Sequence, residues 1–98
     1  MYREEFINKI SDYFKTKPVL KAYLFGSYAR HEENSSSDID LLIELDKSKP
    51  IGIEFIQMYV DLKKITGKEI DLLTMDSVSK YVLPFVLSER KLFYERKA

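Results

Sequence analysis

The chain has 98 residues with sixteen basic and sixteen acidic side chains, so its formal net charge is zero. This length predicts one domain over residues 1–98, and the balanced charge gives no strong field for nucleic acid. No apolar run is long enough to span a membrane, and the absence of cysteine excludes disulfides and thiolate metal sites. These features fit a cytoplasmic protein.

The first half of the chain alternates helical and extended patterns. Apolar residues recur at helical spacing over residues 3–15, which predicts a helix. Residues 19–25 form an apolar run that predicts a strand leading into a Gly-Ser pair. A short helix over residues 28–32, capped by Ser27, and a polar loop over residues 33–37 are expected to follow.

The central part predicts a strand, a long helix and a second strand. Residues 38–45 are expected to be extended, and residues 51–65 form the longest predicted helix. Gly67 is well placed to end that helix. Residues 68–74 then predict a strand with Ile70 on one face and Asp71 on the other.

The last quarter is less regular. Asp76 or Ser77 is expected to cap a helix that reaches about Ser88, with Pro84 interrupting or kinking it. Residues 91–94 predict a short final strand. Together these elements predict an α/β (α+β) domain with a small mixed β-sheet and helices packed mainly on one face.

Two aspartates, Asp38 and Asp40, open the central strand. Side chains alternate along a strand, so both point to the same face, whereas Ile39, Leu41 and Ile43 form an apolar face on the other side. Two like charges side by side repel each other, and a divalent cation between them removes the repulsion. Carboxylate oxygens on a rigid strand suit Mg²⁺.

The Gly-Ser pair at the end of the preceding strand supplies a complementary feature. Gly26 can take a positive φ angle and lets the backbone approach a ligand closely. Ser27 lies at the expected start of a helix, where free N–H groups favour a phosphate. If the predicted strands are neighbours, Asp71 joins Asp38 and Asp40 on one face, which suggests a site for a nucleoside polyphosphate.

Gly26-Ser27, a ten-residue gap and Asp38-Ile39-Asp40 together resemble the signature of the DNA polymerase β-type nucleotidyltransferase superfamily. The fuller string from Phe25 to Arg30, followed by residues 37–41, is similar to its small prokaryotic branch. That branch contains the minimal nucleotidyltransferases, which are the MntA-like partners of HEPN-domain proteins. The resemblance implies the polymerase β-like fold.

The resemblance also implies a reaction, in which AMP passes from ATP to a hydroxyl and pyrophosphate leaves. Asp38 and Asp40 are then expected to bridge two Mg²⁺ ions, and Asp71 to complete the site of the catalytic metal and help deprotonate the hydroxyl. Gly26 and Ser27 are expected to hold the β- and γ-phosphates.

Arg30 has two interpretations from sequence: a bidentate phosphate donor, or a surface ion pair with Glu32, Glu33 or Glu44. His31 stands where relatives often have glycine, and it is interpreted as a surface residue. Glu44 is interpreted as a solvated charge at the strand end. The tyrosines that could stack on a base are assigned no role; they are Tyr23, Tyr28, Tyr59 and Tyr81.

The resemblance implies an antitoxin that adds AMP to a tyrosine of a HEPN-type toxin, with a homo-oligomer left open. One alternative is a non-catalytic partner that neutralises a toxin by contact. Another is a small-molecule nucleotidyltransferase of the aminoglycoside type, although those usually carry a further helical domain.

Overall fold

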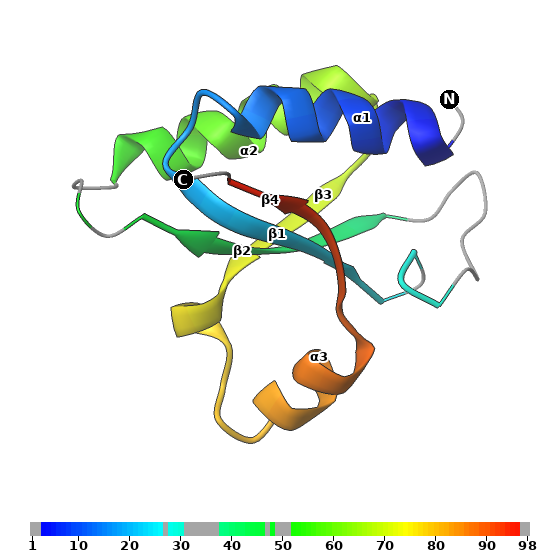
Figure 1. The fold of residues 1–98 in the computed structure, drawn as a ribbon, viewed down its shortest axis with the longest axis vertical. Coiled ribbons are helices and arrows are strands. Elements are labelled where there is room, and N and C mark those ends of the chain that lie inside the picture. Colours follow the sequence, from blue (N-terminus) through cyan, green and yellow to red (C-terminus); the bar gives the residue numbers. More distant parts are fainter. Residues whose placement is uncertain (1–2, 27, 31–37, 47, 49–51, 97–98) are drawn as a thin grey trace.

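A computed structural model describes residues 3–26, 28–30, 38–46, 48 and 52–96. The elements follow one another along the chain as helices and strands (Figure 1). They are α1 (Arg3–Phe14), β1 (Val19–Phe25), β2 (Ile39–Leu45), α2 (Ile53–Thr66), β3 (Ile70–Thr74), the 3₁₀ helix η1 (Met75–Ser77), α3 (Leu83–Glu89) and β4 (Lys91–Glu95).

The strands form one mixed sheet in the order β3-β2-β1-β4. β1 runs antiparallel to both of its neighbours, β2 and β4, whereas β2 and β3 are parallel. A parallel pair needs a crossover connection, and α2 provides it. The predicted mixed sheet is therefore confirmed, and its parallel pair is the one that carries the acidic motifs.

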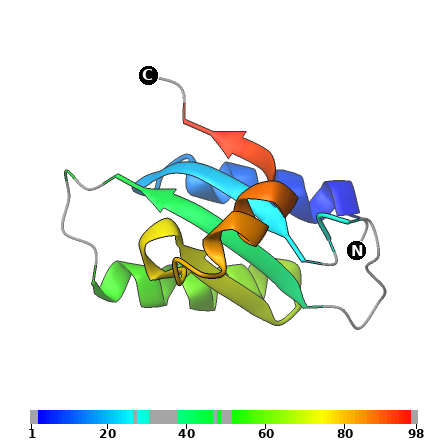
Figure 2. The ribbon, with the colours of Figure 1, turned by 90° about the horizontal axis from the view of Figure 1, so that it is seen from below.

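The two long helices, α1 and α2, cover one face of the sheet, and α3 lies under the other face (Figures 1 and 2). The main core lies between the sheet and the long helices, where Phe6, Ile10 and Phe14 of α1 meet Met58 and Leu62 of α2. Across the helix layer, the Tyr13 hydroxyl donates to Asp61 Oδ2 at 2.5 Å. A smaller core on the other face joins three residues: Tyr23, Leu42 and Val86.

The predicted alternation along β2 is confirmed. Ile39, Leu41 and Ile43 are fully buried in the main core. Leu42, which shares the opposite face with Asp40, is also buried because α3 covers it there. One face of this strand therefore changes from acidic at its start to apolar at its middle.

Two helix predictions are wrong in detail. Residues 28–30 form a turn, closed by a bond from the Arg30 N–H to the Gly26 carbonyl at 3.2 Å, whereas residues 31–32 of that predicted helix lie outside the described residues. The helix expected from Asp76 or Ser77 to Ser88 is divided into η1 and α3. Pro84 lies in the first turn of α3, where a missing N–H costs no hydrogen bond, so it begins this helix and does not interrupt one.

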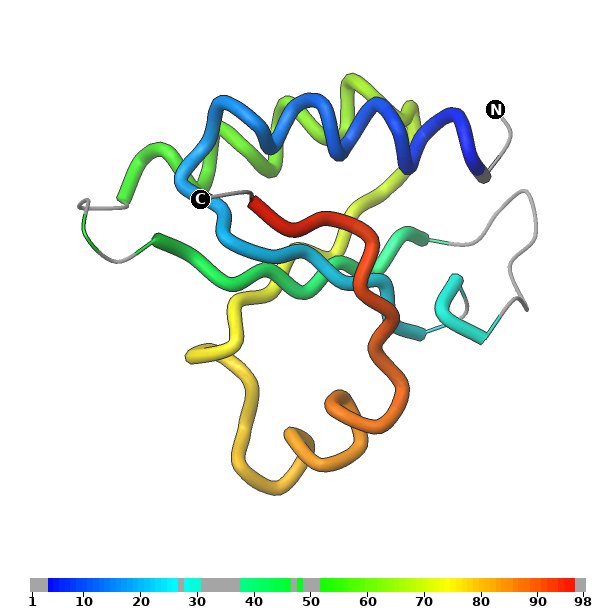
Figure 3. The backbone as a smooth tube through the Cα atoms, viewed as in Figure 1, coloured from blue at the N-terminus to red at the C-terminus, as the bar shows by residue number. Residues whose placement is uncertain are grey.

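The end of α2 follows the prediction. Gly67 takes φ +67° and its N–H bonds to the carbonyl of Lys63, which closes the helix. Within the described ranges, no helix has the length and apolar character needed to cross a membrane. The connection from β3 to β4 is an arch, residues 75–90, that hangs from the sheet on the face opposite α1 and α2 (Figure 3).

Candidate active site

The acidic residues meet where β1 ends and β2 begins. Asp40 pairs with Phe25 across the antiparallel β1–β2 ladder and with Asp71 across the parallel β2–β3 ladder. Residues paired across a ladder point to the same side of a sheet, so Asp40 and Asp71 lie side by side on the face that carries α3. The predicted register of Asp71 is thus confirmed by its pairing.

Gly26 lies directly against Asp40. It has φ +68°, and a Cβ built on it overlaps Asp40 Oδ2 and lies 3.1 Å from Asp40 Cγ. Any side chain here would both strain the backbone and displace the carboxylate. The glycine that the sequence placed beside a ligand therefore has a second role, which is to leave room for an acidic side chain.

The turn after β1 is anchored in the main core. Tyr28 is buried, and its ring meets Phe6 of α1 edge to face, with centroids 5.1 Å apart and planes at 83°. Ala29 is buried beside it. With the hydrogen bond from Arg30 to Gly26, these contacts fix the backbone next to the carboxylates. Tyr28 is thus a core residue, which agrees with assigning it no base-stacking role.

The electrostatics of the carboxylate pair favour binding of a cation. Burial raises the pKa of Asp40 to about 6, assisted by a hydrogen bond with Asp71 and by the negative charges of Asp71 and Asp38. The positive charge of Arg30 acts in the opposite direction. The negative charge of Asp40 is thus disfavoured by burial and by its acidic neighbours, and a divalent cation bound there would offset both effects.

The donor set fits Mg²⁺ in part. Asp40 and Asp71 supply adjacent carboxylates, whereas Asp38 is exposed just before β2 and acts on Asp40 through its charge. In the part of the chain that the structure describes, no three acidic or histidine side chains converge into one metal-binding group. Asp38 would have to turn toward the pair for all three aspartates to share a metal.

Arg30 makes an ion pair that neither sequence interpretation named. Its Nη1 lies 2.6 Å from Oε1 of Glu89, the last residue of α3. Because 59 positions separate the two residues, no local pattern could have indicated this contact. Glu89 thereby joins the arch to the turn that begins at Gly26.

Three other predictions cannot be compared with the structure, whereas a fourth can. Ser27, His31 and the polar loop over residues 33–37 lie outside the described residues. Glu44 is half-buried at the far end of β2, away from the carboxylate pair, and is paired with Lys21 in the ladder.

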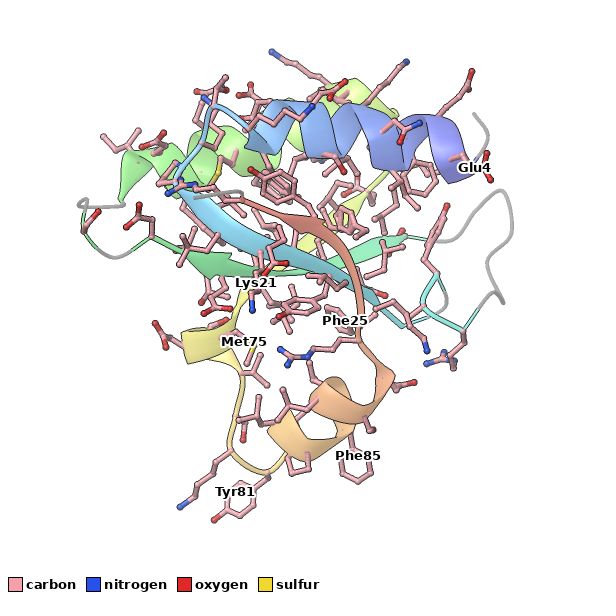
Figure 4. The ribbon with its side chains drawn as sticks, viewed as in Figure 1. Glu4, Lys21, Phe25, Met75, Tyr81 and Phe85 are labelled. Carbon is pink, nitrogen blue, oxygen red and sulfur yellow. The ribbon has the colours of Figure 1, made fainter. Side chains whose placement is uncertain are left out.

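Arg90 belongs to the carboxylate face and was missed from sequence. Its guanidinium carbon lies 4.2 Å from the centre of the Tyr23 ring, and its Nη1 lies 3.6 Å from the sulfur of Met75. The Arg90 side chain therefore joins the arch to β1 through the Tyr23 ring. In Figure 4 Met75 and Phe25 mark the two ends of the space between arch and sheet.

The chain was compared with known proteins. The family described as Polymerase beta, Nucleotidyltransferase matches residues 8–98. A protein of Methanocaldococcus jannaschii that bears the name "Putative protein adenylyltransferase MJ0435" is 37% identical over 71 residues, which are 72% of this chain and 75% of that protein.

Solved structures share the fold. A toxin-antitoxin crystal structure with AMP-PNP gives a TM-score of 0.73 at 22% identity, covering 98% of this chain and 76% of that chain. A second structure holds a tri-AMPylated Shewanella oneidensis HEPN toxin in complex with MNT antitoxin. It gives a TM-score of 0.71 at 21% identity, covering 96% of this chain and 73% of that chain.

Proposed function

This chain belongs to the polymerase β nucleotidyltransferase family, and from that premise we propose that it transfers AMP from ATP to a tyrosine hydroxyl of a HEPN-type toxin. A relative that is 37% identical over 71 residues bears the name of a putative protein adenylyltransferase. Two proteins of the same fold were solved as toxin-antitoxin complexes, one with AMP-PNP and one with an AMPylated toxin. The chain is, on this proposal, an antitoxin that acts by covalent modification.

The observation that carries the proposal is the pairing of Asp40 with Asp71 against Gly26. Two carboxylates on adjacent strands bind a hard cation, and a glycine beside them lets a triphosphate approach the backbone. Burial and the neighbouring carboxylates raise the pKa of Asp40 to about 6, and the positive charge of Mg²⁺ would stabilise the ionised form.

The proposed reaction is an in-line displacement at the α-phosphorus, in which each residue has its own role. Bound Mg²⁺, two ions on our proposal, supplies charge neutralisation at the attacking and leaving oxygens. Asp40 and Asp71, with Asp38 turned toward them, hold the metal. Asp71 also faces solvent and so can accept the proton of the incoming hydroxyl.

The turn beside the carboxylates completes the proposed site. Gly26 and Ser27 hold the β- and γ-phosphates through the backbone, and Arg30 supplies a positive charge at the same turn. As the hydroxyl oxygen bonds to the α-phosphorus, the bond to the β-phosphate oxygen breaks and pyrophosphate leaves. Positioning and charge, with no covalent enzyme intermediate, drive this reaction.

The test uses the purified chain, Mg²⁺, α-labelled ATP and the HEPN-domain protein encoded beside its gene. Transfer of label to a tyrosine, located by mass spectrometry, is the expected result. Asp71→Asn is expected to slow it by about 10²–10³-fold, because a preorganised charge-stabilising group is lost. Asp12→Asn is the matched control, since Asp12 is an exposed aspartate on α1 that pairs only locally with Lys15.

The alternative functions give different results. A non-catalytic antitoxin would bind the HEPN-domain protein equally well as wild type and as Asp71→Asn, and neither would transfer label. A small-molecule nucleotidyltransferase would leave the protein unlabelled but would consume ATP with an added aminoglycoside. Either result would overturn transfer to the toxin.

A further inference from the structure

The arch exposes large apolar side chains that its own chain leaves uncovered. Tyr81 is 78% exposed and Phe85 is 70% exposed, and both point away from the sheet (Figure 4). Val86 faces the sheet and is 5% exposed in the small core. A single exposed apolar residue is ordinary, but two exposed aromatic rings on a seven-residue helix and its leading turn indicate a contact surface.

This surface adjoins the candidate active site. Phe85 lies four residues before Glu89, one helical turn away on the same side of α3. Glu89 in turn contacts Arg30, whose charge reaches Asp40. The exposed helix is thus linked to the carboxylate pair through one ion pair, Glu89–Arg30, and through the charge of Arg30.

The strand after the arch leads to the same end of the sheet. Lys91, the first residue of β4, pairs with Leu24, which is one position before the Phe25–Asp40 pair. The arch therefore crosses the face of the sheet and returns beside the carboxylates. A macromolecule that brings a hydroxyl to Asp71 from this face would approach on the side of the sheet that carries α3 (Figures 1 and 2).

We propose, resting on the function proposed above, that Tyr81 and Phe85 form the docking surface for the acceptor protein. The acceptor offers an apolar patch beside its reactive hydroxyl. Exposed Lys80 lies 5.4 Å from the centre of the Tyr81 ring, so acidic groups are expected around that patch. A second copy of this chain is the poorer occupant, because it would sit where the acceptor must enter.

The helix layer offers a matched control surface. Ile53 and Ile56 of α2 are 84% and 62% exposed, which makes them as accessible as the arch residues. They belong to the layer on the opposite face of the sheet from α3 (Figure 1). An acceptor seated over the carboxylates and the arch does not reach them.

The experiment compares two double variants of the whole chain, Tyr81→Ala/Phe85→Ala and Ile53→Ala/Ile56→Ala. Calorimetry measures their affinity for the HEPN-domain protein, and a second titration measures binding of AMP-PNP with Mg²⁺. The arch variant is expected to bind the protein ten- to hundredfold more weakly, as for aromatic hot spots, with nucleotide binding unchanged. The α2 variant is expected to match the wild type in both titrations. The single variant Phe85→Gln, which only makes an exposed position polar, repeats the test if the double variant folds poorly.

Two results would overturn the docking surface: equal protein affinity in the arch variant and the wild type, or a loss confined to the α2 variant. A third would assign the surface to a second copy, namely an arch variant that changes only the oligomeric state in light scattering. The proposed function fails separately, when the wild type binds the HEPN-domain protein but transfers no AMP. In that case a selective loss of affinity in the arch variant still supports the surface.

Discussion

Replacing Gly26 by alanine separates the two roles of this residue. The substitution forces a Cβ into a backbone at φ +68° and into the space of the Asp40 carboxylate. The backbone strain costs about 1–2 kcal/mol. The overlap is with the far end of a side chain, so Asp40 can rotate away, and the overlap adds little to the loss of stability. It does, however, move a carboxylate that, on our proposal, holds the metal.

Gly67→Ala is the matched control. Gly67 has φ +67°, nearly the same backbone strain, but an added Cβ there meets nothing within 4 Å. Both variants should therefore lose about 1–2 kcal/mol in urea unfolding, or roughly 4–16 °C in melting temperature for a domain of this size. Labelling of the acceptor should fall about hundredfold in Gly26→Ala alone, since a misplacement of about 1 Å has that effect.

The comparison of rates decides whether the reasoning holds. Labelling is measured well below both melting temperatures, so that both variants are folded. A Gly26→Ala rate within about threefold of the Gly67→Ala rate, at equal stability, would refute the argument that Gly26 makes room for Asp40.

Three further predictions concern charge and packing. The pKa of Asp40 is raised to about 6 in the folded chain, so its contribution to stability is complete below about pH 4 and is lost as pH rises through 6. Asp71→Ala should reduce this loss of stability between low and high pH, which urea unfolding at pH 5 and pH 7 in EDTA would measure. If the difference in the free energy of unfolding between the two pH values is unchanged, the interaction of Asp40 with Asp71 is contradicted. Leu62→Ala should destabilise the chain by about 2–5 kcal/mol, because it empties a fully buried position; a loss below about 1 kcal/mol by calorimetry would argue against the described core. Arg96→Ala should lower the urea midpoint of unfolding with no change in labelling, because it removes a 2.7 Å ion pair with Asp46 and a hydrogen bond to the Lys17 carbonyl, both far from the site; altered labelling would contradict that separation.

Much of the sheet could be predicted from sequence because the positions of the strands and the faces of their side chains follow local patterns. The bounds of β1 agree with the predicted residues 19–25, and the alternation of Ile39 with Asp40 gives the faces of β2. Gly67 ends α2 because glycine takes the left-handed conformation without a steric cost. These features depend on backbone sterics and side-chain alternation, and both operate over a few residues.

The arch could not be predicted, because its contacts are remote in sequence. Residues 76–88 have the apolar content of one helix, but the chain has to cross the sheet between β3 and β4, so it divides into η1 and α3. The pairing of Glu89 with Arg30 and the stacking of Arg90 on Tyr23 are results of that crossing. Phe85 is exposed because the neighbouring Val86, and not Phe85, is on the face of α3 that packs against the sheet.

The parallel pairing of β2 with β3 limits how the gene can change in length. Asp71 stands on an edge strand, opposite Asp40, at the end of a crossover that starts at Leu45. One codon inserted between Ile70 and Asp71, inside β3, would turn Asp71 toward the core, and two would restore the face but displace the carboxylate by about 7 Å. Insertions in the connection between β2 and α2 leave the pairing intact. We therefore expect homologous genes to vary in length before α2 and to keep Asp71 directly after the buried residue at position 70.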